Sequence, residues 1–100
     1  MANSTILIDP DAARADISKL RSALGKLEES QGSIKKLSAS AGDMTGQTGT
    51  AITEKCSELN AQISQLKENL NYTIRLIQSA VKEYQEKDQQ LAGAFRSGGV

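Results

Sequence analysis

Three glycines fall within residues 42–49, whose sequence is GDMTGQTG, and the apolar periodicity of the chain stops there. Glycine clusters of this kind are typical of turns. On either side, residues 10–41 and 50–94 repeat apolar side chains every three or four positions, which is the spacing of one face of a helix. The sequence therefore predicts two long helices joined by a short turn.

The second segment carries an unbroken stripe in which steps of four and three residues alternate, the pattern of a helix that packs one narrow face on a neighbour. The stripe comprises Ile52, Cys56, Leu59, Ile63, Leu66, Leu70, Thr73, Ile77, Val81, Tyr84, Asp88, Leu91 and Phe95. The predicted partner interface is formed by eight of its members: Leu59, Ile63, Leu66, Leu70, Ile77, Val81, Leu91 and Phe95. We expect Cys56 to be a small core residue rather than a nucleophile, because buried thiols are usually inert.

The start of the first helix is predicted at Asp9-Pro10-Asp11. Asp9 suits the N-cap, Pro10 suits the first helical position, where its missing amide proton is not needed, and Asp11 favours the positive end of the helix. The stripe that follows comprises Ala13, Ile17, Leu20, Leu24, Leu27, Gln31, Ile34, Leu37 and Ala41. At the other end of the chain, residues 95–100 are predicted to be a frayed tail.

Two such helices form an antiparallel hairpin of unequal arms. At 1.5 Å per residue, the first helix is roughly 48 Å long and the second is roughly 65–70 Å long. Counting back from the turn places Pro10 opposite about Val81, so the stripe from Tyr84 onward extends past the first helix. Residues 6–8, Ile-Leu-Ile, span about 10 Å when extended and could cover Tyr84, while a second protein could cover the rest.

A single seam between two helices cannot bury every apolar residue of this chain. Ala23, Leu37, Ile74 and Leu76 flank the main stripes. We therefore expect an all-α, single-domain helical hairpin that pairs with a second hairpin into a four-helix bundle.

The composition argues against several functions. The chain has one Cys and no His or Trp, so we expect no metal site, no cofactor and no hydrolytic triad, and hence no enzyme. Twelve basic residues balance twelve acidic ones without a basic stripe, which argues against nucleic-acid binding. The start, MANSTILIDP, lacks a secretory signal and no segment approaches a membrane span, so we expect synthesis in the cytoplasm and any export by a non-Sec route.

Tyr84 and Asp88 stand one helical turn apart near the end of the second helix. An aromatic ring is a large rigid anchor, and a nearby carboxylate adds a directional, charge-assisted contact. A carboxylate in an apolar seam is also costly unless it is paired. The pair therefore predicts a docking patch for another protein.

The chain resembles the WXG superfamily of type VII secretion substrates, which are small helical hairpins with Trp-x-Gly in the turn and Tyr-x-x-x-Asp/Glu near the end. Here the turn offers Met44-Thr45-Gly46, with Met in place of Trp, and the tail offers Tyr84 and Asp88. In lacking the Trp, the chain is similar to the small helical partners of LXG toxins. The resemblance implies an export signal at Tyr84 and Asp88, a turn motif at Met44 and Gly46, and delivery to the type VII secretion ATPase.

The same resemblance implies pairing with a protein partner, either as a homodimer or as a heterodimer with a WXG- or LXG-type helical protein that the chain helps to target. Two alternatives remain open. A filament or needle subunit of a type III secretion machine is also a helical hairpin, although its turn usually carries a proline and the only proline here is Pro10. A generic coiled-coil adaptor fits the periodicity but gives Tyr84 and Asp88 no role.

Overall fold

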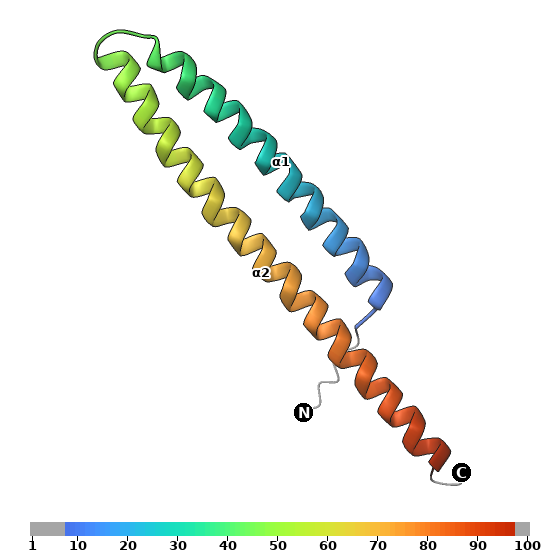
Figure 1. The fold of residues 1–100 in the computed structure, drawn as a ribbon. Helices are drawn as coiled ribbons and strands as arrows, with labels where there is room; N and C mark the ends of the chain where they lie inside the picture. The colour runs from blue at the N-terminus through green and yellow to red at the C-terminus, as the bar shows by residue number, and fades with distance from the viewer. Residues whose placement is uncertain (1–7, 98–100) are drawn as a thin grey trace.

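The computed structural model describes the backbone of residues 8–97 and the side chains of residues 8–91. Within this part of the chain, the structure consists of two helices, α1 (Pro10–Gly42) and α2 (Gln47–Ser97). The helices run side by side in opposite directions and are joined by a short turn (Figure 1). The predicted all-helical hairpin is confirmed.

The helices extend slightly further than the sequence predicts. α1 ends at Gly42, one residue after the predicted end, and α2 begins at Gln47, three residues before the predicted start. α2 then continues to Ser97, so the helix includes residues 95–97 of the tail that the sequence predicts to be frayed. Residues 98–100 lie outside the described part of the chain.

The start of α1 has the predicted N-cap. The Asp9 carboxylate accepts hydrogen bonds from the backbone N–H groups of Asp11, at 3.0 Å, and Ala12, at 3.3 Å. These contacts satisfy two of the amide protons that every helix start leaves without an intrahelical partner. Pro10 occupies the first helical position, where its ring fits the helical φ without loss of a hydrogen bond.

The turn depends on two glycines for different reasons. Gly46 has a φ of +82°, a left-handed conformation that side chains disfavour. Gly49 lies in the first turn of α2, where an added Cβ would stand 2.7 Å from the carbonyl oxygen of Ala41 and 2.8 Å from that of Met44. Because both neighbours are backbone atoms, the end of α1 approaches the start of α2 this closely only if residue 49 has no side chain.

The contact between the helices buries little apolar surface. Within the described residues, the buried hydrophobic side chains are Ala13, Ala41, Cys56 and Ile74. Three of these four are small, and the larger aliphatic residues of the seam, such as Leu24 and Leu70, are only half-buried. A hairpin of this kind leaves most of its apolar surface for other contacts.

The face that α2 turns toward α1 differs from the predicted stripe in its middle section. Residues of the predicted stripe are exposed at Leu59, Leu66 and Thr73, and the next residues along the chain are covered instead. These covered residues are Asn60, Lys67 and Ile74. α1 shows the same shift once, where Ser38 is half-buried and Leu37 is 53% exposed.

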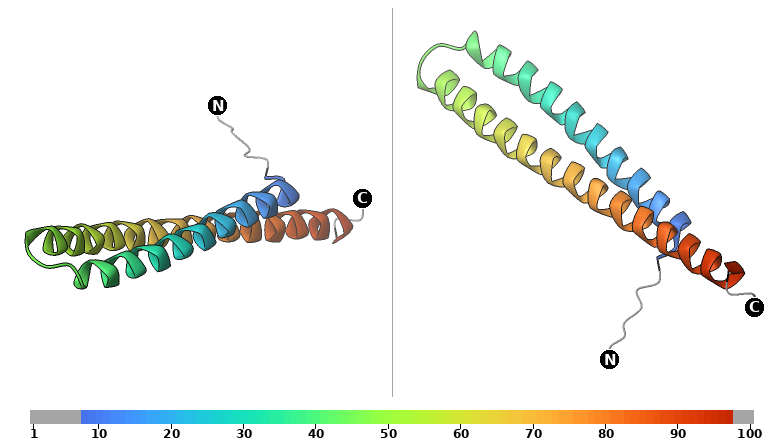
Figure 2. Two further views of the ribbon diagram at one scale, coloured as in Figure 1. Left: turned by 90° about the horizontal axis from the view of Figure 1, so that it is seen from above. Right: turned by 60° about the horizontal axis from the view of Figure 1, so that its bottom comes forward.

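The register of the hairpin is visible at its centre, where the side-chain amide of Gln31 donates to the backbone carbonyl of Asn60 at 3.3 Å. Counting equal numbers of residues outward from this contact brings Pro10 opposite Val81. α2 therefore continues beyond the start of α1 (Figures 1 and 2). We call residues 82–97 of α2 the overhang; it is about 24 Å long at 1.5 Å per residue.

Gly49→Ala is expected to lower the free energy of unfolding by about 1–3 kcal/mol, because the new methyl group must push apart the backbones of α1 and the turn. Urea denaturation followed by helical circular dichroism measures this change. Gly25→Ala is the matched control, since Gly25 lies inside α1 with open space around its Cβ position. There the same substitution should stabilise the protein by about 0.5–1 kcal/mol through helix propensity, and equal effects at both sites would contradict the close approach at Gly49.

Candidate protein-interaction surfaces

Tyr84 and Asp88 both lie on the overhang, one turn apart on α2. Tyr84 is half-buried, Asp88 is exposed, and Leu91 in the next turn is 59% exposed. The three residues continue the line of the seam toward the end of α2, and they change along it from half-buried at Tyr84 to exposed at Asp88 and Leu91. Of the segment suggested as an alternative cover for Tyr84, Ile8 is half-buried, while residues 6 and 7 lie outside the described part of the chain.

The exposure of Asp88 changes the reasoning that first singled it out. A carboxylate inside an apolar seam would need a partner to offset the cost of its burial. Asp88 faces solvent instead, and no ion pair or hydrogen bond joins it to another described residue. Its carboxylate is therefore hydrated and accessible to a second protein at no cost to the hairpin.

The predicted turn motif stands at the other end of the molecule. Met44 is 52% exposed, so it does not act as a buried plug for the turn, and Gly46 provides the left-handed backbone conformation described above. The turn and the overhang occupy opposite ends of the hairpin (Figure 1). Within one chain, Met44 and Gly46 therefore do not share a site with Tyr84 and Asp88.

The predicted partner interface divides into two groups according to burial. Four of its residues are half-buried on the side of α2 that faces α1: Ile63, Leu70, Ile77 and Val81. Three others are exposed: Leu59 at 40%, Leu66 at 46% and Leu91 at 59%. The eighth, Phe95, belongs to the helical part of the chain whose side chains lie outside the description.

One flank of the seam is apolar. Leu59 and Leu66 each precede a seam position of α2, and Leu37 precedes a seam position of α1. In an antiparallel pair, the positions that precede the seam on the two helices lie on the same side of the hairpin. We define the apolar flank as three leucines that are exposed on this one side of the hairpin: Leu37, Leu59 and Leu66.

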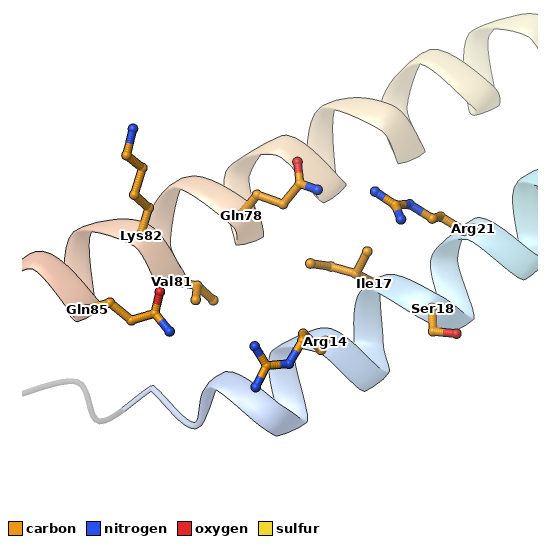
Figure 3. Close-up of a pocket in the computed structure, with 8 residues that line it drawn as sticks. All are labelled: Arg14, Ile17, Ser18, Arg21, Gln78, Val81, Lys82 and Gln85. Atoms are coloured by element: carbon orange, nitrogen blue, oxygen red, sulfur yellow. The ribbon is translucent and has the colours of Figure 1, made fainter.

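The opposite flank is polar. It contains the residues that follow the seam, including Arg14 and Arg21 of α1 and Gln78 and Gln85 of α2. Figure 3 shows these four side chains around a single depression between the helices. The hairpin therefore presents two chemically different faces, although its net charge is zero.

A polar layer crosses the seam at its centre. The amide of Gln31 donates to the hydroxyl of Ser64 at 2.9 Å and accepts from the ammonium of Lys67 at 3.0 Å. Glu28 lies 3.9 Å from the same ammonium. Among the described residues, the buried side-chain oxygen of Asn60 has no hydrogen-bond partner.

This polar layer is the part of the interior that the sequence-based prediction missed. The sequence pattern predicts Gln31 in the seam of the first helix but does not identify its partners. Hydrophobicity alone favours Leu59 and Leu66 as seam residues over Asn60 and Lys67. Periodicity does not distinguish the two choices, since Asn60, Ile63, Lys67, Leu70 and Ile74 follow the same alternation of three and four as the predicted stripe.

The described residues form neither a metal-binding cluster nor a membrane-spanning segment. No three of their His, Cys, Asp and Glu side chains are grouped so as to hold a metal ion. None of the helical segments described is long and apolar enough to cross a bilayer. Cys56 is a free thiol that is 2% exposed, as expected for a small core residue.

The chain matches no protein-family model, no curated protein and no solved structure with which it was compared.

The polar layer can be tested by a double-mutant cycle of Gln31→Ala and Lys67→Ala. Each single variant should lose about 1–2 kcal/mol of unfolding free energy, because it leaves a partly buried polar group without its partner. The double variant should lose less than the sum of the two, with a coupling of at least about 0.5 kcal/mol. Gln65→Ala is the control, since the amide of Gln65 donates only to Asn69 on the same helix surface; strict additivity of the first two variants would contradict the layer.

Proposed function

We propose that this chain is a non-enzymatic type VII secretion protein, acting either as a substrate itself or as the targeting partner of a larger LXG-type effector. Its export signal is the pair Tyr84 and Asp88. The protein is made in the cytoplasm, recognised by the type VII secretion ATPase, and exported by a non-Sec route.

The observation that carries this proposal is the overhang. α2 remains helical to Ser97 while α1 starts opposite Val81, so the last turns of α2 stand beyond the hairpin. The proposed signal lies at the beginning of this free section, where Asp88 and Leu91 are exposed. A signal in this position can be bound by a second protein while the rest of the hairpin stays packed.

The chemistry of the pair suits recognition by a protein. The ring of Tyr84 is half-buried, so one side can be held by the hairpin while the other meets a binding pocket. The carboxylate of Asp88 can accept a charge-assisted hydrogen bond from an Arg or a backbone N–H of the receptor. Because both residues lie on one rigid helix, little conformational entropy is lost when they bind.

Pairing through the apolar flank is the second part of the proposal. The apolar flank, Leu37, Leu59 and Leu66, would be covered if two hairpins packed face to face into a four-helix bundle. The second hairpin is either another copy of this chain or the helical domain of an LXG-type effector. A paired hairpin running in the opposite direction would bring its turn, with Met44 and Gly46, near the overhang and so complete the signal.

Export is tested in a bacterium with a type VII secretion system. Tyr84→Ala and Asp88→Ala should each reduce the protein in the culture medium at least about tenfold, while helix content and partner binding stay unchanged. Quantitative immunoblots of medium and cells, with a cytoplasmic protein as the lysis marker, measure the effect. Glu86→Ala is the matched control, because Glu86 is an exposed acid on the same overhang but off the line of Tyr84 and Asp88.

Normal export of both variants would refute the assigned signal. Equal loss in the Glu86→Ala control would also refute it, because the overhang would then act through its charge rather than through the pair. A generic coiled-coil adaptor predicts that none of the three substitutions affects export.

Pairing is tested separately with Leu66→Glu. In the wild-type protein, light scattering should give either twice the 10.7 kDa chain mass or, with an LXG-type helical domain added, the mass of a one-to-one complex. Leu66→Glu should return the chain to a monomer, because a charge would be placed in the apolar contact. Tyr72→Glu is the control, since Tyr72 is also exposed but lies about 200° round the helix from Ile74 of the seam. A monomer in every mixture would refute pairing.

A further inference from the structure

A groove lies between the helices at the open end of the hairpin, on its polar flank. It has a volume of about 460 Å³ (Figure 3). Eight residues line it: Arg14, Ile17, Ser18 and Arg21 from α1, and Gln78, Val81, Lys82 and Gln85 from α2. The groove is separate from the apolar flank, and it uses neither residue of the proposed export signal.

The charges of the groove all have one sign. Arg14 and Arg21 extend across the groove toward α2, the ammonium of Lys82 points away from α1 (Figure 3), and no acidic residue is among the lining side chains. Arg14 forms an ion pair with Asp11, but both side chains are highly exposed, so this pair is weak and readily exchanged. Within the described part of the chain, no carboxylate is ion-paired with Arg21 or Lys82. The local charge therefore attracts an anionic partner although the whole chain is neutral.

The groove also has an apolar floor. Ile17 and Val81 belong to the seams of their helices and are half-buried. In Figure 3 they lie between the two ribbons, with the amides of Gln78 and Gln85 along one side. A ligand that fills this groove must offer apolar side chains to the floor and carboxylates to the rim, which an inorganic anion or a lipid headgroup alone does not do.

The spacing along the two sides indicates the shape of the ligand. Arg14 and Arg21 are seven residues apart on α1, and Gln78 and Gln85 are seven residues apart on α2. Seven residues are two helical turns, or about 10 Å, and the same repeat governs the side chains of a helix packed alongside. A third helix lying in the groove would place its own seven-residue repeat beside both sides.

We propose that this groove binds an acidic amphipathic helix of a partner protein, with apolar residues on the face toward Ile17 and Val81 and carboxylates about two turns apart beside Arg14 and Arg21. This inference does not depend on the export signal or on pairing through the apolar flank. The hairpin is then a scaffold with a separate docking groove beside its overhang.

The probe is a fluorescein-labelled synthetic helix of about three heptads, with Leu on one face and Glu on both sides of it, titrated against the full chain by fluorescence anisotropy. The wild-type protein should bind this peptide, and raising NaCl from 50 to 300 mM should weaken binding several-fold. Arg14→Glu with Arg21→Glu should weaken it at least about tenfold, since two charge-assisted contacts become repulsive. The same peptide with Lys in place of Glu should bind this charge-reversed variant better than it binds the wild type.

Lys35→Glu with Lys36→Glu is the matched control, because it makes the same change in net charge on exposed positions of α1 outside the groove. Its affinity for the acidic peptide should stay within about twofold of the wild type. Leu66→Glu should also bind normally, which distinguishes the groove from the apolar flank. Circular dichroism of each variant checks that the helices remain formed.

The proposal would be overturned by no binding of the acidic peptide, by an equal loss in the Lys35 and Lys36 control, by loss of peptide binding in Leu66→Glu, or by binding to phosphatidylglycerol vesicles without binding to the peptide. The last result would assign the cations to a lipid surface instead. A change in the mass of the chain on Arg14→Glu with Arg21→Glu would likewise overturn it, because the occupant would then be a second copy of the chain.

Discussion

Two helices that pack side by side share a single line of contact, and among the described residues the buried side chains of that line are mostly small. Ala13, Ala41 and Cys56 bring the helix axes close, but they contribute little apolar area. Because the contact is narrow, the leucines beside it remain in water. The exposed apolar side chains are a consequence of this narrow seam, since a broader intramolecular core would have buried them.

The polar layer at the centre of the seam gives specificity at some cost in stability. Apolar residues in place of Gln31 and Lys67 would pack without desolvating any polar group, and buried polar groups are seldom the most stabilising choice. Their hydrogen bonds, however, are satisfied in one register only, because a slip of one turn would separate Gln31 from Ser64 and from the carbonyl of Asn60. A fixed register matters here, since it determines how much of α2 extends past α1.

Much of the fold could be predicted from the sequence, because local chemistry controls it. The Asp9 cap, the glycine turn and the helical periodicity each act over a few residues, and each is present in the structure. The sequence pattern predicts the wrong face for the middle of α2. Leu59 and Asn60 are adjacent residues on opposite sides of the line through Ile63 and Leu70, and so are Leu66 and Lys67. Hydrophobicity favours the leucines, but Gln31 of α1 bonds to Asn60 and Lys67, which lie on the side that faces inward. The cationic groove was missed for a related reason, since its residues come from segments far apart in the sequence.

The single thiol of the chain lies within the seam, and this position makes it a reporter of motion. Cys56 is 2% exposed, so a maleimide can reach its sulfur only when the two arms separate locally. The rate of alkylation therefore measures the frequency of such openings near the turn. Because the chain contains no other cysteine, this breathing can be followed by mass spectrometry in the unmodified protein, both free and in complex.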